Sequence, residues 1–232
     1  MDCQALLLSE LEHYGYHQLF IASTVYVEKF LSLVNETTYY KTLERFVKNK
    51  ILYRLSKGIY CKIQNGILGI VPISSSKIAA KLIENNAGMY IGYHLYNRLG
   101  LTTQISKKIE VLITEPLKQK NIGIITVETI DIELNPSIVK TIEVLEVLKH
   151  VEKIQDLNIL QLQRYLMNFA LHDYCEASFE QTYQIRKYPK YVINALKQVL
   201  DYYQVEHRLN RYLSTLSKYK NMEILLYGTV FE

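Results

Sequence analysis

The sequence predicts an α+β fold, with an N-terminal winged helix-turn-helix followed by a mixed α/β region and a helical C-terminal region. Three observations lead to this fold class. Two segments with helical spacing between residues 23 and 49 are followed at once by two short alternating strands. Segments rich in β-branched residues lie between 108 and 134, and helical periodicity dominates from Ser137 onward.

The N-terminal elements follow in the order of a winged helix. A first helix is expected over Cys3–Tyr14 and is stopped by Gly15. Ser23 is a suitable N-cap for a second helix. A third helix is expected over Thr38–Asn49, and a β-hairpin with strands at 51–55 and 59–63 turns at 56–58.

The remaining elements define a second region. We expect a helix capped by residues 74–76 and a short helix at His94–Leu99, which Gly100 ends. The further elements are strands at 108–114, 122–127 and 129–134, and helices at 137–153, 157–171, 190–203 and 205–219. We therefore expect a DNA-binding domain at residues 1–68 and an α+β domain at 69–232 with a helical tail at 137–220.

Composition restricts the class of protein. The 232 residues carry a net charge of +4, too mild to identify a nucleic-acid-binding protein by itself. No apolar run approaches the roughly 20 residues that span a bilayer, and the N-terminus lacks the pattern of a secretory signal. The three cysteines are widely spaced, which argues against a disulfide framework or a zinc site. These features predict a cytoplasmic protein.

Positive charge is concentrated in the third helix and the hairpin. Residues 37–62 contain seven cations and one acid, Glu44, a local net charge of +6. Thr38, Lys41, Arg45 and Lys48 recur at three- and four-residue spacing and share one face of the helix. Such a face can lie in a major groove, with its first residues near base edges and its later cations near phosphates. The predicted DNA-binding residues are Thr37, Thr38, Tyr40, Lys41, Arg45, Lys48, Arg54 and Lys57.

A second basic cluster occupies the C-terminal helices and is interleaved with tyrosines. Aromatic rings beside cations can stack on bases, but tyrosines at helical spacing more often pack at the edge of a core. Core packing is therefore the preferred interpretation, with nucleic-acid contact as the alternative. The basic residues are Arg186, Lys187, Lys190, Lys197, Arg208, Arg211, Lys218 and Lys220.

Candidate catalytic residues are few. Asp131 and Glu133 are two apart on an expected strand, so they would point to one side and could hold a divalent metal, as in nucleotidyltransferases. Those enzymes also need a Gly-Ser turn, which the sequence lacks. No Gly-rich phosphate loop, GxSxG elbow or HExxH helix is present. We expect no enzyme activity, cofactor or metal site.

Two segments resemble a known family. The segment Leu52–Tyr60, LYRLSKGIY, is similar to a wing that ends in Gly-Ile-Tyr. The segment Tyr90–Gln104, YIGYHLYNRLGLTTQ, is similar to a block with a Leu-Gly-Leu-Thr-Thr-Gln run. Over residues 17–135 the chain resembles the AbiEi-type antitoxins of bacterial type IV toxin-antitoxin systems, particularly their shorter relatives.

The resemblance implies a function and a partner. It implies a DNA-binding antitoxin that represses its own operon and counters a nucleotidyltransferase-like toxin encoded beside it, without a stable complex with that toxin. The residues alone leave two alternatives open. One is a plasmid or phage winged-helix protein for replication or mobilisation, and the other is a metal-dependent nucleotidyltransferase using Asp131 and Glu133.

Overall fold

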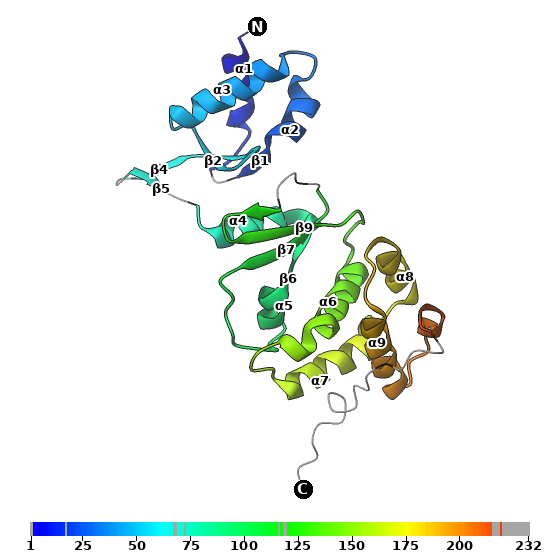
Figure 1. Cartoon of the computed structure of the whole chain (residues 1–232). Coiled ribbons are helices and arrows are strands. Elements are labelled where there is room, and N and C mark those ends of the chain that lie inside the picture. Colours follow the sequence, from blue (N-terminus) through cyan, green and yellow to red (C-terminus); the bar gives the residue numbers. More distant parts are fainter. Residues whose placement is uncertain are drawn as a thin grey trace. The chain divides into compact units, whose positions relative to one another are not determined.

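A computed structural model describes residues 2–16, 18–66, 69–71, 73–115, 117, 120–214 and 219 (Figure 1). The chain has the expected α+β architecture, with a winged helix-turn-helix first, a mixed α/β region next and helices at the C-terminal side. Contacts between Cα atoms divide it into two compact units. The first comprises Met1–Leu82 with Lys118–Ile125, and the second comprises Ile83–Leu117 with Thr126–Glu232.

The first unit begins with three helical segments. The N-terminal helix begins after Asp2, whose side chain accepts a hydrogen bond from the Gln4 amide. The second helix begins at Ala22 without a side-chain cap, so the expected cap at Ser23 is wrong. The helical segments are α1 (Cys3–Glu12), α2 (Ala22–Val25) continued by a π-helical turn (Tyr26–Phe30), and α3 (Glu36–Lys48).

Three strands complete the winged helix. The expected hairpin is present as β2 (Leu52–Ser56) and β3 (Ile59–Lys62). A third strand that the sequence did not predict, β1 (Leu19–Ile21), pairs antiparallel with β3, so the sheet order is β1-β3-β2. The order helix, strand, helix, helix, hairpin, with the early strand on the far side of the hairpin, is the winged-helix topology.

An apolar core fixes the helices of this unit on the sheet. Leu7 and Leu11 of α1 pack with Phe20 of β1 and with Leu43 and Phe46 of α3. Each of these side chains is at most 5% exposed. Burial of large apolar side chains contributes roughly 1.5–3 kcal/mol each, so the core determines which side of α3 faces inward.

The first unit continues beyond the winged helix. A second hairpin follows β3 directly, and α4 begins where the Ser74 side chain accepts a hydrogen bond from the Lys77 amide at 3.3 Å. The serine cap expected at residues 74–76 is therefore confirmed. These elements are β4 (Gln64–Gly66), β5 (Gly69–Val71) and α4 (Ser75–Leu82).

A four-stranded sheet runs in the order β6-β7-β9-β8. Helix α5 (Gly92–Arg98) follows its first strand directly. The strand expected at 122–127 is present only in part, because the chain turns at Gly123 and divides it into β8 and β9. The strand expected at 129–134 is wrong, because residues 130–135 form no strand. The strands are β6 (Gly88–Ile91), β7 (Ile109–Ile113), β8 (Asn121–Ile122) and β9 (Ile125–Thr129).

Helices form the rest of the second unit. Helix α6 is the central one, and nine of its fifteen residues are buried. The helices expected near 137–153, 157–171 and 190–203 are present, whereas α8 was not predicted. The helix expected at 205–219 is wrong over 205–214, where only a 3₁₀ turn forms at Leu209–Tyr212, and residues 215–218 lie outside the described part. The helices are α6 (Pro136–His150), α7 (Ile159–Asn168), continued by a π-helical turn (Phe169–Asp173), α8 (Glu176–Ile185) and α9 (Lys190–Tyr202).

Each helix in the described part of the chain is too short or too polar to cross a bilayer.

Candidate nucleic-acid interface

Helix α3 is the second helix of the helix-turn-helix. Its N-cap is Asn35, whose Oδ1 accepts a hydrogen bond from the Thr37 amide at 2.9 Å. Glu36 lies in the first turn, where a negative charge interacts favourably with the helix dipole. The preceding turn is held by Tyr26, whose hydroxyl donates to the Val34 carbonyl at 3.0 Å. The start of α3 is therefore fixed by local hydrogen bonds.

The inward side of α3 is set by side chains that touch the core. Tyr39, Leu43 and Phe46 are at most 1% exposed. The Tyr39 hydroxyl donates to the Ala22 carbonyl at 3.1 Å, which ties α3 to α2, and burial raises the pKa of Tyr39. The buried Thr42 hydroxyl donates to the Thr38 carbonyl at 2.9 Å. The opposite side of the helix is consequently left to solvent.

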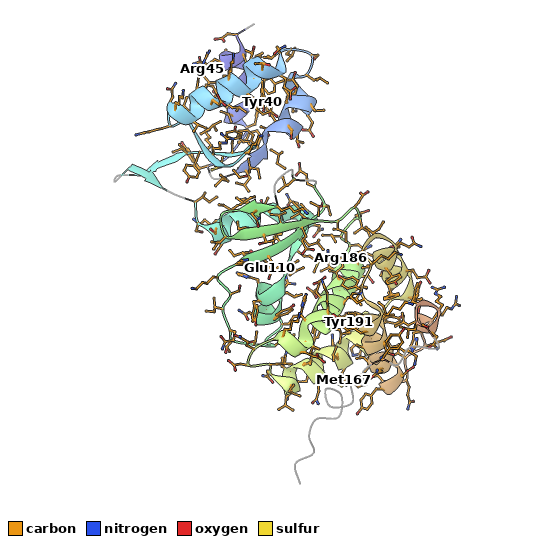
Figure 2. All side chains as sticks on the ribbon, in the orientation of Figure 1. Tyr40, Arg45, Glu110, Met167, Arg186 and Tyr191 are labelled. Carbon is orange, nitrogen blue, oxygen red and sulfur yellow. The ribbon has the colours of Figure 1, made fainter. Side chains whose placement is uncertain are left out.

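The predicted DNA-binding residues of α3 fall into two groups. The exposed ones are Thr37, Thr38, Lys41, Arg45 and Lys48. Tyr40 differs, because its side chain is half-buried and packs edge-on against Tyr39 with 5.3 Å between ring centroids. Tyr40 and Arg45 leave different sides of the helix (Figure 2). Tyr40 therefore lies at the flank of the exposed face rather than on it.

The wing contributes two further cations. Arg54 on β2 is exposed, and its Nε donates to the Ser56 carbonyl at 3.4 Å. Lys57 is exposed at the tip, where Gly58 adopts a φ of +83° that closes the two-residue turn. Arg54 lies opposite Tyr60 in the strand register. The turn thus presents Lys57 at the end of a short, tight hairpin.

The cations of this surface lack anionic partners in the described part of the chain. Lys41, Arg45, Lys48, Arg54 and Lys57 form no ion pair there. Lys62 is engaged instead, because its Nζ donates to the Leu11 carbonyl at 3.3 Å. We call the five cations, together with Thr37 and Thr38, the α3–wing surface. No carboxylate among the described residues of the unit forms an ion pair with these cations.

In the C-terminal basic cluster, unlike the α3–wing surface, several cations contact acidic or aromatic side chains. Arg186 contacts Glu146 and Glu128, each at 2.8 Å. Lys197 pairs with Asp201 at 2.5 Å. Arg211 contacts Glu180, and Lys187 lies over the Tyr183 ring at 4.5 Å from its centroid. Lys218 and Lys220 lie outside the described residues. Much of this charge is therefore already paired, which favours the packing interpretation.

One residue of the α3–wing region was not included among the predicted contacts. Glu44 is exposed on the same outward side as Lys41 and Lys48. Burial raises the pKa of the Tyr60 hydroxyl, the nearby Arg54 opposes this rise, and Glu44 adds a smaller increase. The spacing of residues 37, 41, 44 and 48 places Glu44 on this face, whereas a count of charges shows it only as an opposing acid.

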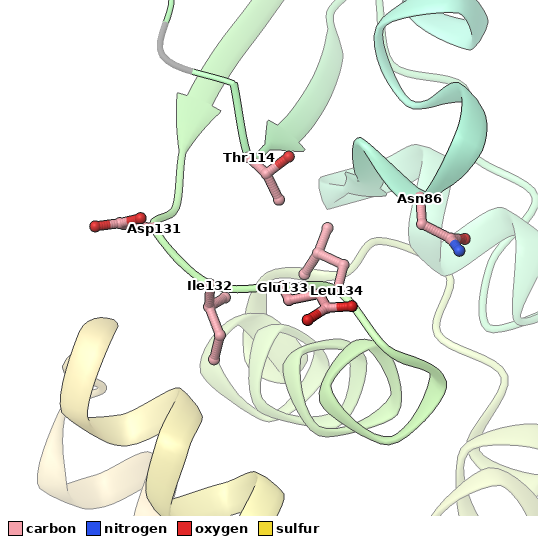
Figure 3. Close-up of a pocket in the computed structure, with 6 residues that line it drawn as sticks. All are labelled: Asn86, Thr114, Asp131, Ile132, Glu133 and Leu134. Carbon is pink, nitrogen blue, oxygen red and sulfur yellow. The ribbon is translucent and has the colours of Figure 1, made fainter.

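Asp131 and Glu133, the carboxylates of the alternative metal site, do not lie on one face of a strand. Asp131 and Glu133 lie after β9 rather than on a strand, and they line an open depression of about 410 Å³ with Asn86, Thr114 and hydrophobic neighbours. Their carboxylates point in different directions (Figure 3). The described residues contain no group of three His, Cys, Asp or Glu side chains that could hold a metal ion.

The Asn97–Gln104 segment has a structural role. Gly100 ends α5 with a φ of +70°, and the Thr102 hydroxyl donates to the Gln155 carbonyl at 2.6 Å. The Gln104 amide nitrogen donates to Thr102 Oγ1 at 3.1 Å. The Leu101 carbonyl accepts from the Asn158 amide at 2.8 Å. The segment therefore holds the loop that leads into α7.

Three comparisons relate the chain to known proteins. No curated protein sequence matches it significantly. It is similar to the crystal structure of the RV2827C protein from Mycobacterium tuberculosis, at 12% identity and a TM-score of 0.43, over 88% of this chain and 78% of that one. Residues 17–133, half of the chain, match the model of a family of unknown function, DUF6088. The chain therefore belongs to the DUF6088 family.

Proposed function

We propose that this protein is a sequence-specific DNA-binding regulator that uses the α3–wing surface. The observation that carries the proposal is the set of exposed cations on α3 and the wing that have no anionic partner in the described residues. Five unpaired cations on one helix and its adjoining hairpin supply the sequence-independent attraction to phosphates. The winged-helix fold supplies an element that fits a major groove.

The positions of these residues suggest that some of them contact bases and others contact phosphates. The capped start of α3 presents Thr37, Thr38 and Lys41, which would approach base edges. Arg45 and Lys48 lie later in the helix and would contact phosphates beside the groove. Lys57 at the wing tip would reach the flanking backbone. Base contacts then provide specificity, and phosphate contacts provide register and affinity.

We further propose that the regulator is a bacterial antitoxin that represses its own operon in the cytoplasm. This part rests on the resemblance of residues 17–135 to AbiEi-type antitoxins. The partner is then a nucleotidyltransferase-like toxin encoded beside it. The Asn97–Gln104 segment supports this only as a shared structural feature, because the side chains of Thr102 and Gln104 are used within the second unit.

The DNA-binding proposal is tested by selecting sequences from random duplexes with the purified full chain and then measuring affinity. We expect an enriched motif that recurs upstream of its own gene. Its affinity should exceed that for random DNA by at least about 10³-fold at physiological salt. Equal affinity for selected and random duplexes would contradict the proposal that the protein is a sequence-specific regulator.

The antitoxin proposal needs a separate assay. Cells that express the neighbouring nucleotidyltransferase-like gene should stop growing, and co-expression of this chain should restore growth. Sequence-specific DNA binding without rescue would leave a regulator that is not an antitoxin, such as a replication or mobilisation factor.

A further inference from the structure

Glu44 is exposed on the outward side of α3, between Lys41 and Lys48 along the helix. It lies seven residues after Thr37, three after Lys41 and four before Lys48. At 3.6 residues per turn these four positions form one stripe along the helix. The buried Tyr39, Leu43 and Phe46 define the opposite side. A helix that enters a groove with its lysines would therefore carry this carboxylate in with them.

The carboxylate of Glu44 is available for a ligand. Its side chain is exposed, and no hydrogen bond or ion pair joins it to another residue of the described chain. Lys41 and Lys48 are one helical turn away on either side, yet neither lies within ion-pair distance. Exposed pairs of this kind are weak in water, because solvent screens the two charges. Breaking a transient pair to Lys41 or Lys48 would consequently cost little.

A carboxylate has a restricted choice of partners in DNA. It repels phosphates, and it accepts hydrogen bonds but donates none when ionised. In the major groove, cytosine N4 and adenine N6 offer amino donors, whereas guanine O6, guanine N7 and thymine O4 are acceptors. Acidic side chains in such a groove characteristically accept from cytosine N4. Guanine and thymine would instead face the carboxylate with their own oxygens.

We infer that Glu44 is a specificity-determining residue of the α3–wing surface, which selects cytosine at one position of the DNA site and lowers affinity for other sequences. This inference rests on the proposed DNA-binding function. It assigns opposite effects to neighbouring residues. Arg45 and Lys48 raise affinity for all DNA, whereas Glu44 lowers general affinity and increases discrimination between sequences.

The test uses the full chain with Glu44→Gln, which keeps the size of the side chain and removes its charge. Glu12→Gln, an equally exposed acid on α1, is the matched control for net charge. Each protein is subjected to sequence selection from random duplexes. The affinities for the wild-type motif, for the motif with its cytosine replaced and for random DNA are then measured at one salt concentration.

We expect Glu44→Gln to bind random DNA more tightly than wild type and to lose about tenfold of the discrimination at one cytosine position. Glu12→Gln should keep the wild-type motif and discrimination. A Glu44→Gln motif identical to that of wild type, with unchanged discrimination at every position, would overturn the inference while leaving the DNA-binding proposal intact. Absence of any selected motif for wild type would refute the proposed function itself.

Discussion

At the scale of single residues, unpaired charge distinguishes the two basic regions of the chain. The α3–wing cations have no anionic partner in the described residues, whereas Arg186 and Lys197 each contact a carboxylate. A sequence count treats these cations alike. The two regions differ in where acidic side chains lie. Cations without a neighbouring acid can attract phosphate, whereas cations paired with a carboxylate of the same chain are already neutralised.

Two substitutions on the α3–wing surface should have different effects on binding. Lys57→Ala should weaken binding to all duplexes alike and reduce the magnitude of the log–log salt slope by about 1, because one counterion fewer is released. Thr38→Ala should cost about 1–3 kcal/mol on the selected site and less on random DNA. Fluorescence titrations across a range of salt concentrations measure both. Identical behaviour of the two variants would contradict the assigned roles.

A buried ion pair in the second unit predicts how stability depends on pH. Burial alone would raise the pKa of Glu146, but Arg186 and Lys149, with hydrogen bonds from Arg186 and Tyr188, outweigh it and lower the pKa. A carboxyl whose pKa is lower in the folded state stabilises the fold above its unfolded pKa. This contribution is lost as the pH falls through the folded pKa.

Glu146→Gln should therefore destabilise the protein at pH 7 by about 3 kcal/mol, because Arg186 loses its buried partner. The difference from wild type should shrink as the pH falls below the ordinary glutamate range. Urea unfolding at several pH values checks this. A difference that stays constant down to acid pH would show that the charge of Glu146 does not contribute.

At the scale of secondary-structure elements, periodicity predicted those with a continuous apolar side. Helix α3 and the β2–β3 hairpin were predicted for this reason. Strand β1 was missed because it has only three residues, too few to show alternation. Helix α8 was missed because its buried side includes Ser178 and Thr182, so its apolar stripe is interrupted. In both cases pairing or packing with distant residues determines the structure.

The candidate site was predicted in outline. The cations of α3 and the wing are exposed as expected, because charged side chains opposite the apolar side of an element face solvent. Tyr40 is at the flank because its ring packs against Tyr39, a contact that helical spacing does not reveal. The expected strand carrying Asp131 was wrong because the chain leaves the sheet after Thr129.

The turn at the wing tip predicts a loss of stability when Gly58 is replaced. Gly58 has a φ of +83°, and a Cβ there would meet nothing within 4 Å, so the cost of Gly58→Ala comes from the backbone alone. That cost is roughly 1–2 kcal/mol. Gly15→Ala is the control, because Gly15 lacks a positive φ and its Cβ would make ordinary contact. Thermal unfolding should show a lower Tm for Gly58→Ala than for Gly15→Ala, and equal Tm values would contradict the assigned turn.

At the scale of the whole molecule, separate apolar cores indicate two folding units. One core joins residues between Cys3 and Tyr60 in the first unit, whereas a larger core between Leu95 and Leu209 and a smaller one between Met89 and Ile142 lie in the second. We predict that a chain lacking residues 1–65 remains folded, because the larger core retains all its members. Circular dichroism with a cooperative thermal transition would support this, and an unfolded or aggregated product would indicate one merged domain.

Separate units also predict separable activities. A chain without the winged helix should lose repression of its operon while keeping some protection against the toxin, if the antitoxin activity resides in the second unit. Loss of both activities in a truncated protein that is shown to be folded would assign both to the first unit.

The central claim is that α3 and the wing form a phosphate-facing surface, and the most direct measurement is a salt titration of one triple variant. Lys41→Ala, Arg45→Ala and Lys48→Ala are combined in the full chain, and binding to selected and random duplexes is followed by fluorescence. We predict weaker binding to both duplexes and a salt slope smaller in magnitude by about 2, because Arg45 and Lys48 are the two phosphate contacts among the three residues. Unchanged affinity and slope in the folded variant would mean that α3 presents only a solvated face.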